Sequence, residues 1–208
     1  MKKTVEEHAA RFSEEAAEYD GSKSEEYHAC ANLVIDYADP DAADAVLDLG
    51  AGTGAIALAL APDAERVLAR DVSEGMMDEG RRKAEERGLD NVAFAYGEFR
   101  DPEVDPDRRI DIVTSNFALH HLADDEKREA IREMAATGAR RIVLGDVAFF
   151  EDPDPEAPFY GPEVDDPGTV GTHVEAFTAE GFAVTAVERV HDQVAVIVAE
   201  RGTALADR

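Results

Sequence analysis

The feature that most constrains this chain is a row of glycines at alternate positions, Gly50, Gly52 and Gly54. They stand within residues 46–60, VLDLGAGTGAIALAL, after a short apolar run and before an Ala/Leu-rich run typical of a helix. Glycine lets the backbone turn tightly and approach a ligand, so such a turn between strand and helix commonly holds a nucleotide. The stretch also fits the dinucleotide fingerprint G-x-G-x-x-G/A, so it predicts an α/β fold but leaves the ligand open.

Segments typical of strands and of helices alternate beyond the glycines, as they do in a parallel sheet covered by helices. The expected strands are 46–49, 66–71, 91–96, 110–115, 141–147, 182–190 and 194–200. The expected helices are 54–60, 73–87, 124–139 and 171–179, and two more open at the capping-box patterns Thr4-x-x-Glu7 and Ser22-x-x-Glu25. Three residues separate the last two strands, which must therefore pair antiparallel.

The length of 208 residues suits one domain. We expect a single domain over residues 1–208, with a helical cap over 1–44 and a Rossmann-like core over 45–201. The core is predicted to be a doubly wound α/β sheet of seven mostly parallel strands with an antiparallel C-terminal hairpin strand.

The chain is strongly acidic: 47 Asp and Glu against 21 Lys and Arg give a formal net charge of −26. The acids recur in pairs along the whole chain, which indicates a charged surface rather than one acidic site. Such a surface repels itself in dilute buffer, and at about 1 M salt, where the Debye length is roughly 3 Å, the repulsion is screened. We therefore expect a halophilic protein; the alternative is an acidic protein from an ordinary cytoplasm. The few short basic clusters also argue against a nucleic-acid partner.

The compartment is predicted from three simple features. Cys30 is the only cysteine, so no disulfide forms within the chain. The first twenty or so residues hold no apolar segment of the kind found in secretory signals. The longest apolar run, residues 55–61, is too short to span a membrane. We expect a cytoplasmic protein with no membrane partner.

Ligands of open α/β sheets bind at the carboxyl ends of the strands, so the residues that follow each strand matter most. Asp48 precedes the glycines, where a carboxylate disfavours a pyrophosphate and suits a cationic ligand. Asp71 ends the second strand and could accept hydrogen bonds from both hydroxyls of a ribose. Glu98 and Phe99 follow the third strand, where the carboxylate could accept from an adenine amino group and the ring could cover the base. The alternatives are a helix cap at Asp71 and a solvated loop acid at Glu98.

The fourth strand is followed by Asn116 and by two adjacent histidines, His120 and His121. Adjacent histidines rarely bind one metal, and no suitably spaced Asp, Glu or His completes a site, so the sequence predicts no metal. Either histidine could act as a general base, and the alternative is a structural histidine packed in the turn.

Taken together, these segments resemble the class I S-adenosylmethionine-dependent methyltransferases over roughly residues 8 to 200. VLDLGAGTG resembles the first motif of that family, DVSEGMMDEGRRKAEERG the second, GEF the third and IDIVTSNFALHHL the fourth. The third motif more usually has Asp where this chain has Glu98. AFTAEGFAV and the terminal strand pair resemble the closing segment. The similarity is nearest to small stand-alone enzymes with small-molecule acceptors, including C-methyltransferases of quinone biosynthesis.

The resemblance implies that S-adenosylmethionine is the cofactor and that its methyl group passes in line to a small-molecule acceptor. It implies contacts of the methionine part with the glycine turn and with carbonyls near Asn116, of the ribose with Asp71, and of adenine with Glu98 and Phe99. The implied cofactor-binding residues are Asp48, Gly50, Ala51, Gly52, Gly54, Asp71, Val72, Met76, Glu98, Phe99, Asn116 and Tyr19, and the candidate catalytic residues are His120 and His121.

Two functions from other classes stay open: an NAD-dependent oxidoreductase, and a non-catalytic cofactor-binding module or partner subunit. The acceptor is also open. The N-terminal helices and the aromatic residues of the loop 149–170 are expected to select it, although those rings could equally fill the edge of the core. A homodimer is compatible with the sequence.

Overall fold

A computed structural model describes residues 4–16, 18–151, 159–161 and 164–202, and it contains one sheet. The strands are β1 (Ala45–Leu49), β2 (Arg66–Asp71), β3 (Val92–Tyr96), β4 (Ile112–Asn116), β5 (Arg141–Phe149), β6 (Gly168–Thr169), β7 (Ala183–His191) and β8 (Val194–Glu200). Their order is β3-β2-β1-β4-β5-β8-β7, and β6 pairs with β5 off this path. β8 runs antiparallel to both of its neighbours, β5 and β7, whereas the other strand pairs of this sheet are parallel. The predicted doubly wound sheet of seven strands is confirmed, and the two-residue β6, too short for any periodicity, is an addition.

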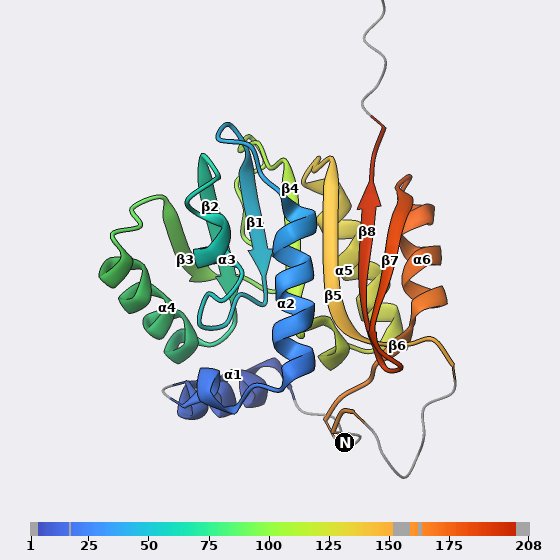
Figure 1. Cartoon of the computed structure of the whole chain (residues 1–208), viewed down its shortest axis with the longest axis horizontal. Helices are drawn as coiled ribbons and strands as arrows, with labels where there is room; N and C mark the ends of the chain where they lie inside the picture. Colours follow the sequence, from blue (N-terminus) through green and yellow to red (C-terminus); the bar gives the residue numbers. More distant parts are fainter. Residues whose placement is uncertain (1–3, 17, 152–158, 162–163, 203–208) are drawn as a thin grey trace, which may run out of the picture.

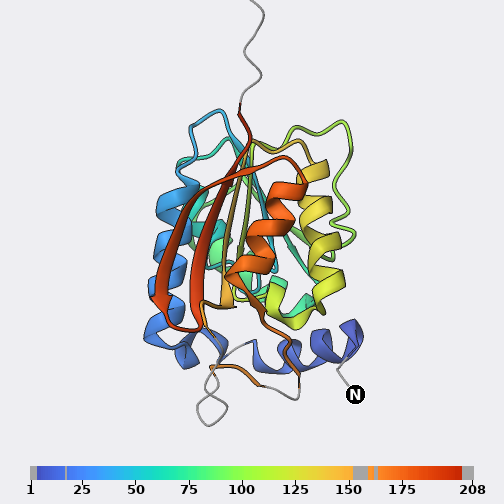
Figure 2. The ribbon, with the colours of Figure 1, turned by 90° about the vertical axis from the view of Figure 1, so that its right-hand side faces the viewer.

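Helices cover both faces of the sheet, as Figures 1 and 2 show. The α-helices are α1 (Val5–Glu15), α2 (Glu25–Ala38), α3 (Ala57–Leu60), α4 (Glu74–Arg87), α5 (Asp124–Ala136) and α6 (Val170–Ala179), and the 3-10 helices are η1 (Tyr19–Ser22) and η2 (Leu119–His121). One buried apolar cluster joins α2, α3 and α4 to one face, and a second joins α5 and α6 to the other. No helix in the described ranges combines the length and the apolar character that a membrane span requires.

Local chemistry explains where the first helices begin. Thr4 and Glu7 form the predicted capping box, in which the Glu7 amide donates to Thr4 Oγ1 at 3.3 Å and the Thr4 amide to Glu7 Oε2 at 2.8 Å. The second predicted box is wrong. Because Tyr19–Ser22 closes a tight 3-10 turn, α2 begins later, and its cap is Ser24, whose Oγ accepts from the Tyr27 amide at 3.2 Å.

The glycine turn also shortens a predicted helix. Gly54 has a φ of +85°, which lies outside the range of a right-handed helix. The helix expected from residue 54 therefore starts only at Ala57.

The segment predicted as an N-terminal cap divides into two parts. α2 buries Cys30 and Val34 against the sheet and belongs to one of its faces. α1 instead lies beyond the carboxyl ends of the parallel strands (Figure 1). A hydrogen bond of 2.8 Å between the hydroxyls of Ser13 and Ser73 joins α1 to the start of α4. α1 is thus the element that covers the edge of the sheet at which a ligand is expected.

Candidate active site

A cavity of about 530 Å³ opens under α1, at the carboxyl ends of the strands. Most of the residues implicated by the sequence line it: Tyr19, Gly50, Ala51, Gly52, Asp71, Val72, Met76, Glu98, Phe99, Asn116 and His121. Asp48, Gly54 and His120 are not part of its wall. The cavity lining also contains residues that the sequence analysis missed, among them His8 and Phe12 of α1 and Tyr27 of α2. Their spacing on amphipathic helices is that of ordinary core residues, so no local signal distinguished them.

The glycine turn lines the cavity, and its backbone conformation favours glycine. Gly50 and Gly52 have φ values of +66° and +53°, which favour glycine. A Cβ atom on Gly50 would also lie 2.4 Å from Cβ of Ala118. The Gly52 amide donates to Asp71 Oδ2 at 2.7 Å, and the Ser73 amide donates to Asp71 Oδ1 at 2.8 Å. These two bonds fix the Asp71 carboxylate beside the turn, where it can still accept from a ligand.

Asp48 braces the turn from beneath. Its side chain is almost fully buried, and Thr114 Oγ1 donates to Asp48 Oδ1 at 2.8 Å. Burial raises the pKa of Asp48 to about 7, because the carboxylate loses its hydration. Asp48 is not part of the cavity wall, so it supports the turn from behind.

Asn116 supplies unused hydrogen-bonding groups at the cavity wall. Both its amide oxygen and its amide nitrogen are buried and form no hydrogen bond of good geometry within the described part of the chain, although the Tyr27 hydroxyl interacts with this amide. Buried polar atoms are nearly always satisfied, so a polar ligand is expected to complete this residue. Near the other end of the lining, Tyr96 Oη donates to Glu98 Oε1 at 2.6 Å and orients that carboxylate.

Two tyrosine rings and one lysine stand beside the glycine turn. Lys23 Nζ lies 3.0 Å from the centre of the Tyr19 ring and 4.8 Å from that of Tyr27. Burial raises the pKa of Tyr27 to about 12 and lowers the pKa of Lys23 to about 8. The rings present an apolar wall, and the lysine backs it with a positive charge.

His120 forms a buried ion pair behind the cavity. Its Nδ1 lies 2.5 Å from Asp146 Oδ1, and its amide donates to Asp146 Oδ2 at 2.8 Å. Burial acts to lower the pKa of His120, but the Asp146 carboxylate outweighs burial, so the net pKa is raised. Burial likewise acts to raise the pKa of Asp146, and the His120 charge outweighs it and lowers that pKa. Each partner therefore favours the charged form of the other.

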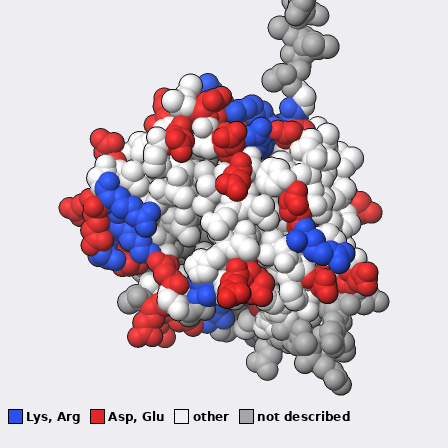
Figure 3. All heavy atoms as spheres, in the orientation of Figure 1, with Lys and Arg blue, Asp and Glu red and all other residues white. Residues whose placement is uncertain are grey.

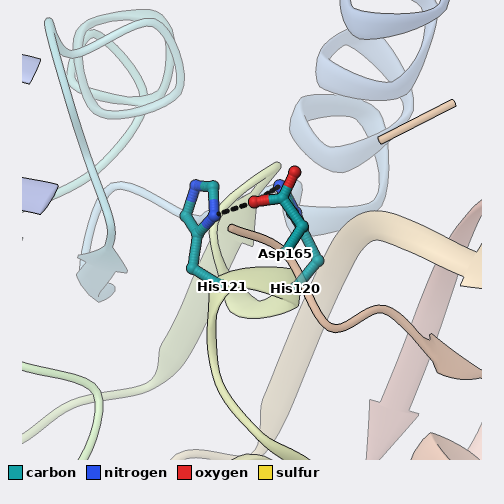
Figure 4. Close-up of side chains that lie close together, drawn as sticks. All are labelled: His120, His121 and Asp165. Atoms are coloured by element: carbon teal, nitrogen blue, oxygen red, sulfur yellow. Dashed lines mark hydrogen bonds and ion pairs between the residues drawn. The ribbon is translucent and has the colours of Figure 1, made fainter. Parts of the chain in front are cut away.

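His121 lines the cavity. It pairs with Asp165, as Figure 4 shows. The distance from His121 Nδ1 to Asp165 Oδ1 is 2.7 Å, and the same oxygen lies 4.0 Å from His120 Nε2. Burial lowers the pKa of His121, against the opposing hydrogen bond to Asp165, so the ring is neutral at pH 7. His8 packs against it with ring centres 4.9 Å apart.

The three groups of Figure 4 also bear on the prediction that no metal binds. Their ligand atoms lie within 4.8 Å of one another. The reason drawn from the sequence, that no third ligand completes the histidine pair, is therefore wrong. Asp165 is 44 residues away from His121, in a loop whose course no periodicity predicts.

Comparison with known proteins identifies the family. A model of the methyltransferase domain family matches residues 46–138. Demethylmenaquinone methyltransferase of Clavibacter sepedonicus is 40% identical over 107 residues, which are 50% of this chain and 42% of that protein. An uncharacterized methyltransferase of Staphylococcus carnosus is 30% identical over 146 residues, 66% of this chain and 67% of that protein. The chain belongs to the class I S-adenosylmethionine-dependent methyltransferases.

Other relatives show how much of their own length this chain matches. The chain spans about half the length of several curated relatives that it matches, such as YcgJ of Bacillus subtilis, with 36% identity over 123 residues and 47% of that protein covered. The solved complex of DhpI with SAH has a TM-score of 0.72 at 24% identity, and the match covers 96% of this chain and 98% of that one. This last likeness shows the fold.

The cofactor of the methyltransferase is S-adenosylmethionine, and the residues at the cavity fit it. The glycine turn lets the protein backbone come close to a ligand. The amide of Asn116 suits a ligand that has both hydrogen-bond donors and acceptors. The Asp71 carboxylate suits hydroxyl donors. The sulfonium and ammonium charges suit a wall that carries Asp71 and Glu98 and has Asp48 behind it.

Proposed function

We propose that this protein transfers the methyl group of S-adenosylmethionine to a small molecule whose attacking atom carries a proton, with His121 as the general base. The observation that carries the proposal is the state of His121 at the cavity wall. Its Nδ1 is held by Asp165 at 2.7 Å, so Nε2 is the nitrogen left to meet an acceptor. A neutral imidazole in a cavity is the form that a general base requires.

The remaining residues bind, orient and exclude water. When bound, S-adenosylmethionine supplies a methyl carbon already activated on a sulfonium. In the proposal, the turn at Gly50 and Gly52 and the amide of Asn116 hold the methionine part, and Asp71 holds the ribose. Val72, Met76, Glu98 and Phe99 surround the adenine, Tyr19 closes over the methionine end, and α1 keeps water out of the cavity. Asp48 and Gly54 shape the turn from behind, and His120 supports His121.

A small, planar acceptor fits the remaining wall. A volume of about 530 Å³ has to hold both the cofactor and the acceptor. Rings stand close together in the lining: Phe12 and Tyr19 have centres 6.0 Å apart, and Tyr27 and Phe117 have centres 5.3 Å apart. Aromatic side chains stack on flat ligands, so a phenol or a quinol is the class that we propose. The name of the Clavibacter relative, a demethylmenaquinone methyltransferase, supports this class.

Calorimetry followed by an acceptor panel tests the proposal. We expect S-adenosylhomocysteine to bind and phenolic acceptors to be methylated, and we expect His121→Gln to lower kcat for phenols by roughly 10²- to 10⁴-fold. A thiol acceptor that is already ionised should lose much less. Binding of NAD in place of S-adenosylhomocysteine would favour the oxidoreductase alternative. Cofactor binding without turnover over a broad panel would favour a non-catalytic module.

The proposal extends to the setting of the enzyme. We propose a single domain over residues 1–208 that works in a salt-rich cytoplasm, without nucleic-acid or membrane partners and without a resident metal. Figure 3 supports an acidic, salt-adapted surface, because Asp and Glu side chains lie at many separate places around this face rather than in one patch. Light scattering at high salt would measure whether the protein forms the homodimer with which the sequence is compatible.

A further inference from the structure

We propose that Asp165 is a positioning residue of the methyl-transfer reaction: it fixes the tautomer of His121 and carries the charge that balances the proton His121 takes up. The inference rests on the proposed function, in which His121 removes the proton of the acceptor. Its evidence is the contacts of the Asp165 carboxylate, a residue that the sequence analysis did not assign to the site.

The backbone around Asp165 fixes the direction of its carboxylate. The Gly161 amide donates to Asp165 Oδ2 at 2.8 Å, and the Asp165 amide donates to the Gly161 carbonyl at 2.9 Å. The next amide, of Asp166, donates to the His120 carbonyl at 2.7 Å and ties this segment to the histidine turn. With Oδ2 engaged and only 9% of the side chain exposed, Asp165 presents Oδ1 to His121.

This geometry decides which nitrogen of His121 carries the proton. A carboxylate is only an acceptor, so the short contact at 2.7 Å requires a hydrogen on Nδ1. The lone pair of the neutral ring is then on Nε2. Asp165 therefore holds His121 in the one neutral tautomer that can accept a proton at Nε2.

The charges of the cluster also favour proton uptake. Histidine neighbours lower the pKa of Asp146 and of Asp165 against the effect of burial, so both are carboxylates, and the Asp146 carboxylate raises the pKa of His120. When His120 is protonated and His121 is neutral, the four groups sum to −1, and after His121 gains a proton they sum to zero. A proton on His121 thus cancels the excess negative charge of the cluster, which offsets part of the burial that lowers the His121 pKa.

The other titratable groups packed around the cluster do not change this balance. They are His8 of α1, Lys127 and Asp124 of α5, and His173 of α6. Lys127 and Asp124 form an ion pair at 3.2 Å and offset each other. Burial lowers the pKa of His173, which is therefore neutral at pH 7.

Asp165→Asn gives a sharp test, because the structure predicts how the amide will sit. The Gly161 amide needs an acceptor at the Oδ2 position, so the amide oxygen occupies that position and the NH₂ group faces His121. An NH₂ donor forces Nδ1 to accept, which moves the ring hydrogen to Nε2 and removes the lone pair from the cavity. We expect ¹⁵N imidazole NMR of the full chain with S-adenosylhomocysteine to show Nδ1–H in the wild type and Nε2–H in D165N.

Kinetics supply the second readout. For a phenolic acceptor, D165N should lower kcat by about 10²-fold with KM nearly unchanged, and it should move the acidic limb of the pH profile to lower pH because the His121 pKa falls. An ionised thiol acceptor should be nearly unaffected. Asp192→Asn, an exposed carboxylate of the β7–β8 turn, is the matched control and should change neither readout. Asp165→Glu, which keeps an acceptor, should retain the Nδ1–H tautomer and covers the case that D165N does not fold.

Each outcome of these experiments supports or overturns one of the two proposals. A His121 that stays Nδ1–H in D165N, with an unmoved acidic limb, would overturn the positioning role. So would activity that a chelator abolishes and Zn²⁺ restores, since Asp165 would then be a metal ligand. A wild-type protein that binds S-adenosylhomocysteine but methylates no acceptor would instead overturn the proposed function. The NMR result distinguishes the two failures because it needs no turnover.

Discussion

Buried carboxyl groups dominate the behaviour of single residues in this protein, and Asp48 is the clearest case. Its pKa is raised to about 7, so the folded state holds this proton more tightly than the unfolded state does. The resulting stabilisation is fully present below the ordinary pKa of about 3.9 and is lost as the pH rises through 7. The buried carboxylate is tolerated because a cationic ligand is expected on the other side of the turn.

We therefore predict that Asp48→Asn stabilises the ligand-free protein at pH 8 and changes little at pH 5. The gain in unfolding free energy should be a few kcal/mol at most, at about 1.4 kcal/mol per pKa unit. An Asn side chain can still accept the Thr114 hydroxyl, so the fold of the turn is kept. Urea unfolding at both pH values measures the difference, and a gap between the variants that does not widen with pH would contradict the prediction.

The buried ion pair of His120 and Asp146 makes the stability of the fold depend on pH, because the pair exists only while His120 is protonated. We predict that His120→Gln costs about 3 kcal/mol at pH 5.5, since it leaves Asp146 buried and uncompensated. His120 has a raised pKa, so its contribution is complete below pH 6.5 or so and is lost as the pH rises through that raised value. Unfolding curves at pH 5.5 and 9 should show a smaller cost at pH 9, and an equal cost at both would rule this account out.

How much of the site could be predicted depends on where each residue stands in the chain. The sequence shows the apolar runs of the strands that end at or just before Asp71, Glu98 and Asn116. Their meeting at one edge of the sheet therefore follows from the fold. Asp165 and Lys23 stand in irregular segments, and their contacts depend on loop conformation and on packing between distant segments. No rule based on residue propensity or sequence spacing predicts such contacts.

At the scale of elements, the packing of α4 on β3 depends on a missing side chain. A Cβ atom on Gly80 would lie 2.5 Å from Cε1 of Phe94. In an exposed helix, replacing Gly by Ala usually stabilises by about 1 kcal/mol. Here the overlap with the ring reverses the sign, because α4 and β3 would have to separate.

We predict that Gly80→Ala lowers the unfolding free energy by about 1–2 kcal/mol, as overpacking does. Gly171 of α6 is the matched control: its nearest neighbour would be 3.6 Å from a new Cβ, so Gly171→Ala should stabilise by up to about 1 kcal/mol. Chemical unfolding of both variants measures the two signs. Equal effects would show that helix propensity, and not the Phe94 contact, sets the outcome.

Elements with strong periodicity were predicted well, and short or irregular ones were not. β1, β2 and β4 stand within two residues of their expected limits because their apolar runs are buried on both faces. α3 and β6 are too short for periodicity to locate. The positive φ of Gly54 also delays the start of α3. The 3-10 turn at Tyr19–Ser22 displaced the start of α2, since a capping pattern does not reveal which of two nearby serines caps.

For the whole molecule, the net charge of −26 sets the response to salt. We predict that the urea midpoint of the wild type rises clearly between dilute buffer and 2 M KCl, because the surface repulsion is screened. Reversing three exposed acids, Asp63, Glu85 and Asp107, to lysine changes the net charge by two units each, from −26 to −20, and should reduce that rise. Equal salt responses in the two proteins would assign the effect to salting-out of apolar surface rather than to charge.

The reversed direction of β8 has a practical consequence for measuring ligand binding. The parallel strands end under α1, whereas β8 ends at the opposite edge of the sheet (Figures 1 and 2). Immobilisation on a sensor chip through the far end of β8 therefore leaves the α1 end of the molecule, where the cavity lies, facing the solution, and anchoring near α1 brings the chip surface to that end. Thiol coupling offers no third route, because Cys30 is fully enclosed between α2 and the sheet. A sensor experiment on this enzyme is best oriented by the far end of β8.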